Sequence, residues 1–426
     1  MSFVIEPIPS PEDVPELKPL LDHQDDPSFV AQLLQSLNKA NELAKDGGLD
    51  PAIYDALPLE GMNGWPTTFD EYANYLVVYS RWIPHQSTNP AWVNPTSPIP
   101  GEHREVYDYL CWFYWMIDQE LDDGGVLQNI PWFADFLVEW ANMWGRFLDT
   151  PVSFSKDILE TWRKESPRYR IEDSMIPDEW HRGELRPNSP SGWLTFNQFF
   201  ARELNPGLRP IAYPGDNTTI TSPADCTYKK QYAIDADSNI TPPIVVKGTH
   251  TYANVKRLLE GSQYADCFAE GHFVHSFLGP YSYHRFHTPV AGIVKECYPV
   301  KGQVYLQVSL SGQQFDAADS ADDGYEFLQA RGVLTIDTTG SPYGDVGFVA
   351  VIPIGMCQVS GVNMTHEIDK ECAKGDEFGY FTFGGSDIIV LTQKGTNPLY
   401  NPAFVDGTEY YSLYGSPIAN VTPLKN

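Results

Sequence analysis

Residues 381–391 read FTFGGSDIIVL, in which two glycines and a serine separate two runs of β-strand type. A hairpin turn would explain the glycines, because glycine adopts backbone conformations that other residues avoid. The serine, Ser386, is however followed at once by Asp387 and then by residues 388–391, an apolar run typical of a buried strand. The pattern therefore leaves three alternatives for Ser386: a turn residue, a nucleophile, or a residue with less usual chemistry.

The part of the chain around this stretch has the composition of a β domain. Short runs rich in β-branched and aromatic residues are separated by glycine and proline, as is typical of strands joined by turns. These runs cover residues 244–247, 304–310, 346–352 and 388–392. They predict a mostly antiparallel β domain over residues 186–426, a length within the ordinary range for one domain.

The first part of the chain shows helical periodicity. Asp26 and Pro27 provide an N-cap and a first-turn proline, apolar residues follow at helical spacing, and a glycine pair at residues 47 and 48 ends the run. Further helices are expected at residues 68–82, 102–120, 131–148 and 154–166. Because the turn-rich sequence RPNSPSG at residues 186–192 marks a boundary, we predict an α+β protein with an N-terminal helical domain over residues 1–185.

The charge of the chain restricts its partners. Its 426 residues include 56 Asp and Glu against 28 Lys and Arg, a net charge of −28. Such a surface repels phosphate backbones and anionic lipid headgroups. We therefore expect no nucleic-acid partner and no stable membrane association. The longest apolar run, residues 110–117, is also far shorter than a membrane span and is interpreted as core.

The cysteines and the start of the chain indicate a reducing compartment. The six cysteines are widely scattered and form no Cys-x-x-Cys pair. Free buried thiols are the expected state of such cysteines. The first residues lack the basic and apolar regions of a signal peptide. A cytoplasmic location is therefore expected.

Two histidines stand out in YSYHRFHTPVAG, residues 281–292. His284 and His287 are three residues apart, but the second histidine at i+4 and the glutamate of the common zinc motif are missing. No metal is therefore expected. Two alternatives remain open from the residues alone: polar side chains satisfied within a turn, or an acid/base pair.

Asp225, in ITSPADCTYKK at residues 220–230, also has two interpretations. It follows a β-type stretch and a proline, where an aspartate is usually a turn or cap residue. It could instead orient a histidine, as the acidic member of a catalytic triad does. Ser386 does not fit the Gly-x-Ser-x-Gly elbow of hydrolases. Phosphate-binding glycine motifs are missing, and no lysine indicates pyridoxal phosphate (PLP).

Four motifs in a fixed order give the chain a family resemblance. They are TFNQFFARELNPGLRPI at residues 195–211, SPAD at 222–225, YHRFHTPVAG at 283–292 and KGDEFGYFTFGGS at 374–386. Together they resemble the motifs of the phosphatidylserine decarboxylase family of pyruvoyl enzymes. The order of four motifs over about half of the chain is far more specific than any one of them.

The resemblance implies a role for each candidate residue. The Ser386 hydroxyl would attack the carbonyl of Gly385, so that the proenzyme cleaves itself between residues 385 and 386 and leaves a pyruvoyl cofactor at position 386. His287 would take the hydroxyl proton, and Asp225 would hold its imidazole. The substrate amine would form a Schiff base with the cofactor, and His284 would return a proton after carbon dioxide leaves.

Departures from the family pattern affect the expected substrate. The cleavage sequence is Phe-Gly-Gly-Ser-Asp instead of the usual Leu-Gly-Ser-Thr, and the helical N-terminal region is similar to the soluble branch that includes fungal L-tryptophan decarboxylase. A free aromatic L-amino acid is therefore the expected substrate, and the family implies a homodimer. One alternative is phosphatidylserine decarboxylation to phosphatidylethanolamine in phospholipid biosynthesis.

A second alternative belongs to another functional class. Residues 287–304 and 367–381 resemble the two halves of a barrel-sandwich hybrid of the lipoyl type. An inactive, non-enzymatic scaffold could use the same barrel-sandwich-like domain. The presence of Asp225, His284, His287 and Ser386 together favours the enzyme.

Overall fold

A computed structural model describes residues 7–94, 100–175, 187–189, 191–246, 250–317, 327–358, 361–405 and 409–424. The described residues form two compact units. One lies within Met1–Phe199 and Gln303–Ala318, and the other within Phe200–Gly302 and Asp319–Asn426. The boundary expected between residues 185 and 186 lies outside the described residues.

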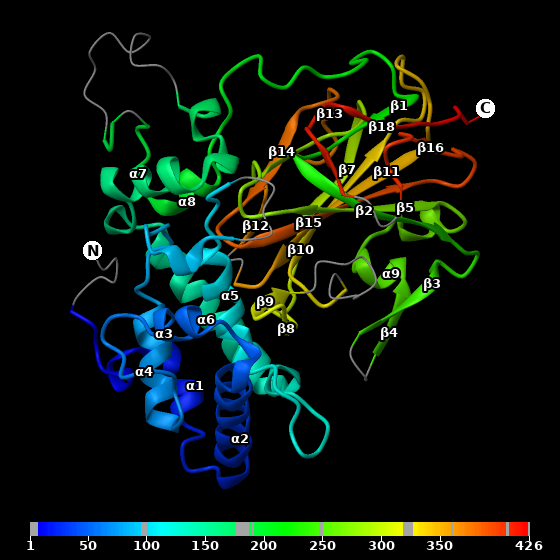
Figure 1. Cartoon of the computed structure of the whole chain (residues 1–426). Helices are drawn as coiled ribbons and strands as arrows, with labels where there is room; N and C mark the ends of the chain where they lie inside the picture. The colour runs from blue at the N-terminus through cyan, green and yellow to red at the C-terminus, as the bar shows by residue number, and fades with distance from the viewer. Residues whose placement is uncertain are drawn as a thin grey trace. The chain divides into compact units, whose positions relative to one another are not determined.

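The first unit is helical, as the sequence predicts (Figure 1). The α-helices within the described residues are α1 (Lys18–Leu21), α2 (Pro27–Leu43), α3 (Pro51–Ala56), α4 (Phe69–Tyr79), α5 (Glu105–Trp115), α6 (Pro131–Leu148), α7 (Lys156–Glu165), α8 (Phe196–Phe200) and, in the second unit, α9 (Val255–Leu258). None of these described helices combines the length and the apolar character that crossing a bilayer requires.

Local capping explains why several helix starts are predictable. The Asp26 carboxylate accepts hydrogen bonds from the backbone N–H groups of Ser28 and Phe29 at the start of α2. Thr68 and Glu71 form a capping box at the start of α4. The helix expected at residues 102–120 is shorter, because His103 pairs with Val93 in an isolated β-bridge and α5 begins only at Glu105.

Aromatic side chains form the core of the helical unit. Trp112 and Phe113 of α5 are buried and pack against Tyr75 and Tyr79 of α4, with ring centroids 4.9–6.1 Å apart. Each large apolar side chain buried in this way stabilises the fold by roughly 1.5–3 kcal/mol. The apolar run at residues 110–117 is therefore core, which confirms its interpretation from the sequence.

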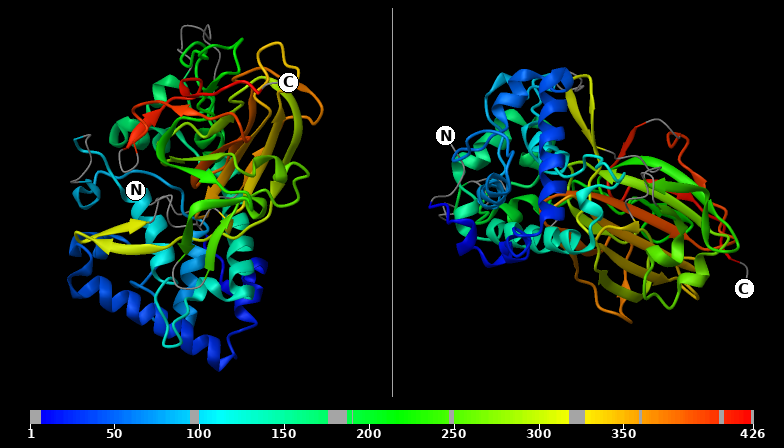
Figure 2. Two further views of the ribbon diagram at one scale, coloured as in Figure 1. Left: turned by 90° about the vertical axis from the view of Figure 1, so that its right-hand side faces the viewer. Right: turned by 90° about the horizontal axis from the view of Figure 1, so that it is seen from below.

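The helical unit also contains a hairpin that comes from a distant part of the chain. Strands β8 (Val308–Ser311) and β9 (Gln314–Ala317) pair with each other (yellow in Figures 1 and 2). The expectation of a strand at residues 304–310 within the β domain was wrong in place and in extent. The reason is a set of polar contacts with the helical unit: the Asp118 carboxylate accepts from the Val308 N–H at 3.0 Å, and the Gln128 side chain donates to the Leu306 carbonyl at 2.9 Å.

The second unit is built on antiparallel sheets, as predicted. Its ten-stranded sheet has the order β13-β7-β10-β11-β15-β5-β2-β3-β4, with β17 also paired to β2. The order of the described strands is open at both ends, so this sheet does not close into a barrel. These strands are β2 (Cys226–Ile234), β3 (Asn239–Val246), β4 (His250–Asn254), β5 (His272–Leu278), β7 (Gly292–Val300), β10 (Arg331–Asp337), β11 (Phe348–Met356), β13 (Glu371–Cys372), β15 (Gly385–Thr392) and β17 (Tyr410–Ser412).

Two smaller sheets complete the second unit. One has the order β1-β18-β16 and the other β12-β14-β6. Their strands are β1 (Thr219–Thr221), β18 (Pro417–Asn420), β16 (Leu399–Tyr400), β12 (Val362–Met364), β14 (Glu377–Phe381) and β6 (Arg285–His287). Three of the predicted β runs fall wholly or partly in β3, β11 and β15, and residue 247 of the first run lies outside the described residues.

The main core of the second unit covers one face of the large sheet. Ile354 of β11, Ile389 of β15 and Phe273 of β5 belong to it, together with Leu258 of α9. Side chains of a strand alternate between the two faces, so odd-numbered residues of β15 point into this core. Even-numbered residues, including Ser386, lie on the opposite face.

Candidate active site around Ser386

Ser386 lies near the start of a central strand. Strand β15 pairs with β11 on one side and β5 on the other, and the backbone partners of Ser386 are Gly355 and Leu278 (Figure 1). The serine is fully buried, and its Oγ has no hydrogen-bond partner among the residues that the structure describes. Its cross-strand neighbour Gly355 has no side chain. A buried hydroxyl without a partner is costly, so this one requires an explanation other than folding stability.

The glycines before Ser386 form the connection that leads into β15. Strand β14 ends at Phe381 and β15 begins at Gly385, so Ser386 belongs to the strand and not to the turn. Gly384 has φ +153°, a conformation that residues with a side chain rarely adopt. The glycines therefore let the backbone turn directly next to the serine, and the simple turn-residue interpretation of Ser386 does not hold.

His284 lies in the loop that leaves the strand next to Ser386. This loop follows Leu278, the backbone partner of Ser386, and the His284 carbonyl accepts a hydrogen bond from the Phe381 N–H at 2.9 Å. The imidazole is fully buried and stacks on Phe200 with centroids 3.8 Å apart. Burial, and next the charge of Arg202, lower the pKa of His284 well below its ordinary value. The ring is therefore neutral at pH 7.

His287 makes a hydrogen bond with each ring nitrogen. Nδ1 lies 2.9 Å from the carbonyl oxygen of Gly375, and Nε2 lies 3.0 Å from the hydroxyl of Tyr283. A carbonyl only accepts, so Nδ1 carries the proton and the Nε2 lone pair accepts from Tyr283. Burial lowers the pKa of His287 to about 4, and the bond to Gly375 offsets part of this effect. The residue is thus a neutral imidazole whose basic Nε2 lone pair accepts the hydrogen bond of the Tyr283 hydroxyl.

Asp225 has a different partner from the one that the family resemblance implies. Its carboxylate accepts from Arg209, with Nε at 3.0 and 3.1 Å from the two oxygens, and from the Tyr414 N–H at 2.8 Å. His287 instead stacks on the Tyr414 ring with centroids 3.9 Å apart. Its backbone N–H also bonds to the Pro223 carbonyl at 2.7 Å. The structure therefore brings Asp225 and His287 together through Tyr414, while the carboxylate itself bonds to Arg209 and Tyr414.

Several residues of this region were missed by the sequence reasoning. Arg209 stands in the quoted LRPI segment, but nothing in the sequence names its partner. Tyr414 lies far from the four motifs, and only the fold reveals its ring beside His287. A third histidine, His275 of β5, was also missed. Its Nε2 lies 3.1 Å from an Asp387 carboxylate oxygen, and both side chains are fully buried. The only sequence signal for this pair was a charged residue at the start of an apolar strand.

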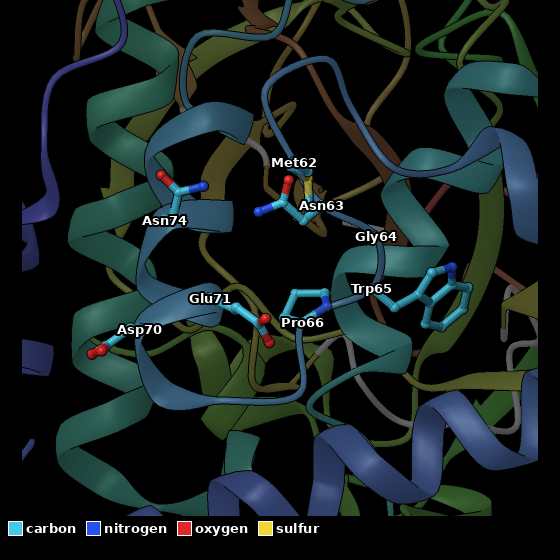
Figure 3. A pocket seen from close by; sticks show the side chains of 8 residues that line it. All are labelled: Met62, Asn63, Gly64, Trp65, Pro66, Asp70, Glu71 and Asn74. Atoms are coloured by element: carbon cyan, nitrogen blue, oxygen red, sulfur yellow. The ribbon is translucent and has the colours of Figure 1, made fainter.

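A pocket in the helical unit contains none of the candidate residues (Figure 3). Its volume is about 220 Å³, and its polar lining includes Asp70, Glu71 and Asn74. The Glu71 carboxylate is already bonded to the backbone N–H groups of Thr67 and Thr68 as part of the helix cap. Elsewhere, no cluster of three or more His, Cys, Asp or Glu side chains in the described ranges could hold a metal ion.

Comparisons with known proteins point to one family. The sequence model described as "Phosphatidylserine decarboxylase" matches residues 196–406. A phosphatidylserine decarboxylase proenzyme of Fusobacterium nucleatum is 30% identical over 262 residues, which cover 61% of this chain and 74% of that protein. Decarboxylase iboD of Amanita muscaria is 27% identical over 311 residues, covering 67% of this chain and 82% of that protein.

Other relatives are much longer than the matched region. Phosphatidylserine decarboxylase proenzyme 2 of Oryza sativa subsp. japonica is 32% identical over 262 residues, but the chain covers only 37% of it. For phosphatidylserine decarboxylase proenzyme 3 of Schizosaccharomyces pombe the identity is 32% over 200 residues, which cover 47% of this chain and 19% of that protein.

Proposed function

Since the chain belongs to the phosphatidylserine decarboxylase family, we propose that it is a pyruvoyl-dependent decarboxylase that makes its own cofactor by cleavage between Gly385 and Ser386. The observation that carries this proposal is the Ser386 hydroxyl, which is buried and unpartnered within the described residues, one residue into a central strand. A strand of a large sheet is a rigid element on which to mount a cofactor.

The residues around Ser386 suit an internal acyl transfer. The Ser386 Oγ attacks the carbonyl carbon of Gly385, the peptide C–N bond breaks and an ester forms. Loss of the Ser386 α-proton then breaks the Cβ–Oγ bond, so Oγ leaves in the Gly385 carboxylate. Water replaces the nitrogen of residue 386, which departs as ammonia. We assign the role of base to the neutral His287, whose Nε2 lone pair accepts from the Tyr283 hydroxyl, and we propose that this hydroxyl relays the proton.

Decarboxylation uses the other histidine. A pyruvoyl group at position 386 supplies an electrophilic carbonyl that binds the substrate amine and takes up the electron pair left when carbon dioxide departs. His284 carries one proton on a neutral ring that stacks on Phe200, and its carbonyl accepts from the N–H of Phe381, the last residue of β14. We propose that His284 returns a proton to the substrate carbon. Phe200 also packs on Phe383 at 5.1 Å, and such apolar surroundings favour the loss of a charged carboxylate as neutral carbon dioxide.

For the substrate we favour a free aromatic L-amino acid. Two observations support a substrate other than a lipid. The net charge of −28 disfavours anionic membranes, and a relative matched over most of its length, Decarboxylase iboD, carries a name that mentions no lipid. The second candidate is phosphatidylserine, because several matched relatives are phosphatidylserine decarboxylase proenzymes by name. We also propose that the protein is a cytoplasmic homodimer. The molar mass measured by light scattering tests the dimeric state.

The test of the cleavage is an intact mass measurement of the purified protein under denaturing conditions. We expect a fragment of residues 386–426, 426 − 385 = 41 residues, whose first residue is a pyruvoyl group. Ser386→Ala should remain a single chain. Ser238→Ala is the matched control, because Ser238 is also buried with an unpartnered hydroxyl in the same unit. An uncleaved wild-type chain, or a cleaved Ser386→Ala chain, would contradict the proposal and favour the inactive scaffold.

The test of the substrate is a screen for release of labelled carbon dioxide. L-tryptophan, L-tyrosine and L-phenylalanine are compared with phosphatidylserine in vesicles, each carrying the label in the carboxyl group. Release from an amino acid at a rate at least a hundred times that from the lipid is expected. Release from the lipid alone would instead establish the second candidate.

A further inference from the structure

A buried contact between a histidine and an aspartate directly follows the proposed cleavage site. The Asp387 carboxylate lies 3.1 Å from Nε2 of His275, and neither side chain is exposed to solvent. The two residues come from neighbouring strands, where Asp387 is paired with Phe277 and His275 with Ile389. The contact is thus diagonal across the β5–β15 ladder, one residue beyond Ser386.

The pair and the serine occupy opposite faces of the sheet. Side chains at positions 386 and 387 of one strand point in opposite directions. Asp387 therefore shares its face with Ile354, its backbone partner on β11, and with the apolar core around Ile389. The pair can act on residue 386 only through the strand, without filling the space into which the Ser386 hydroxyl points.

The energetics of such a pair argue against a role in stability alone. Moving a carboxylate and an imidazole into an apolar core carries a desolvation penalty that their mutual attraction offsets only in part. Apolar residues of similar size at these positions would fill the core at lower cost, as Ile389 and Leu391 do farther along β15. What the pair adds is a contact between side chains of two neighbouring strands, with His275 Nε2 and an Asp387 carboxylate oxygen 3.1 Å apart.

The need for such a contact arises at the proposed cleavage site. Once the bond before residue 386 is cut, β15 loses its covalent link to β14, and residue 386 becomes the end of a chain. Ends of strands fray unless side chains hold them. The Asp387 carboxylate is the first side-chain tether after that end, and its partner lies on β5, which remains in the other fragment.

We propose that His275 and Asp387 are a positioning pair, which holds the start of β15 in register so that residue 386 keeps its place during and after cleavage. This inference rests on the proposed function. Neither residue touches the reacting atoms of residue 386; both act through the backbone of the strand.

The experiment follows cleavage of freshly synthesised full-length protein by intact mass over time. Asp387→Asn and His275→Gln should each slow the formation of the 386–426 fragment at least tenfold. The double variant should be no slower than the slower single variant, because the two residues act as one unit. In the cleaved fraction, kcat for the best substrate of the screen should fall at least fivefold while KM stays within twofold.

Glu105→Gln is the matched control. Glu105 forms a buried pair of the same kind with His85, at 3.7 Å, in the helical unit. If lost stability alone were responsible, this variant would also slow cleavage. We expect its cleavage rate and its kcat to stay within twofold of wild type.

Hydrogen exchange measured by mass spectrometry on residues 386–392 gives a readout independent of activity. In folded variants of the pair, these amides should exchange at least tenfold faster than in wild type. Cleavage and exchange within twofold of wild type in both variants would overturn the inference.

If the variants do not fold, hydrogen exchange of the cleaved wild-type protein decides. Exchange at residues 387–389 as slow as at 390–392 supports the tether, and rapid exchange at residues 387–389 refutes it. A wild-type chain that is never cleaved would refute the proposed function, while the exchange comparison would still decide the role of the pair.

Discussion

Arg209 shows how much of the site depends on a single side chain outside the expected residues. Its guanidinium and the Asp225 carboxylate are both almost fully buried and bond to each other through two nitrogen atoms. Burial raises the pKa of Tyr414, whose ring stacks on His287; the Arg209 charge lowers this pKa and the Asp225 charge raises it. The motif sequence places Arg209 near the site but cannot specify a partner 16 residues away in a different backbone segment.

Removing the guanidinium should be costly for this reason. Arg209→Met leaves a buried carboxylate without its cation, so the free energy of unfolding should fall by about 3–5 kcal/mol. The measurement is urea unfolding followed by tryptophan fluorescence. Asp225→Asn in the same chain should recover at least half of the loss. Arg146→Met is the control, because Arg146 makes an exposed pair with Glu16 and should cost less than about 1 kcal/mol.

The buried His287 predicts a dependence of stability on pH. Its pKa is about 4 in the folded protein, against about 6.5 when exposed. Between these values the unfolded chain binds a proton that the folded chain excludes, so stability is lost as the pH falls from 6.5 to 4. The contribution amounts to up to about 3 kcal/mol.

The difference in the free energy of unfolding between wild type and His287→Gln isolates the contribution of His287. The Glu105 pKa, raised to about 7 by burial, gives the opposite slope in both proteins and cancels in the difference. The free energy of unfolding, measured at intervals from pH 4 to 7, should show the advantage of wild type growing with pH. A difference that does not change with pH would contradict a histidine buried in its neutral form.

At the scale of elements, predictions from sequence hold where the determinants are local. The start of α2 follows from Asp26 and Pro27, and the start of α4 from Thr68 and Glu71, because each cap lies within four residues of its helix. The hairpin β8–β9 was assigned to the wrong unit, because its hydrogen-bond partner Asp118 lies after α5, 190 residues earlier in the chain than Val308. The candidate site shows the same contrast between local and distant determinants. The motifs identified His284, His287, Asp225 and Ser386, whereas the hydrogen bonds of these residues to their neighbours could be seen only in the folded structure.

The hairpin contacts can be tested at Gln128. Its side-chain amide donates to the Leu306 carbonyl at 2.9 Å and accepts from the Leu306 N–H at 3.2 Å. Gln128→Leu should leave both backbone groups buried without partners and lower the free energy of unfolding by about 2–4 kcal/mol. Gln35→Leu, which removes an exposed bond to Asp122, should cost less than about 0.5 kcal/mol. The measurement is urea unfolding. Equal losses in the free energy of unfolding for the two variants would show that the Gln128 contact with the hairpin does not stabilise the protein.

At the scale of the whole molecule, the segment after the proposed cut remains part of several sheets. Strand β15 is central between β11 and β5, β17 pairs with β2, and β18 pairs with β1. All of these partners precede residue 386. We therefore expect the two fragments to stay together in native mass spectrometry and to separate only after denaturation. A 41-residue fragment that elutes alone under native conditions would contradict this arrangement.

The hairpin β8–β9 also has a consequence for synthesis on the ribosome. The helices up to residue 175 leave the exit tunnel well before residues 303–317 are translated. During this interval Asp118 and Gln128 lack the backbone groups that they bond in the finished protein. A nascent chain that pauses in this interval would expose polar groups and apolar surface meant for the hairpin, which is the kind of surface that chaperones recognise. The helical unit, although first in the chain, therefore finishes folding only when synthesis has passed residue 317.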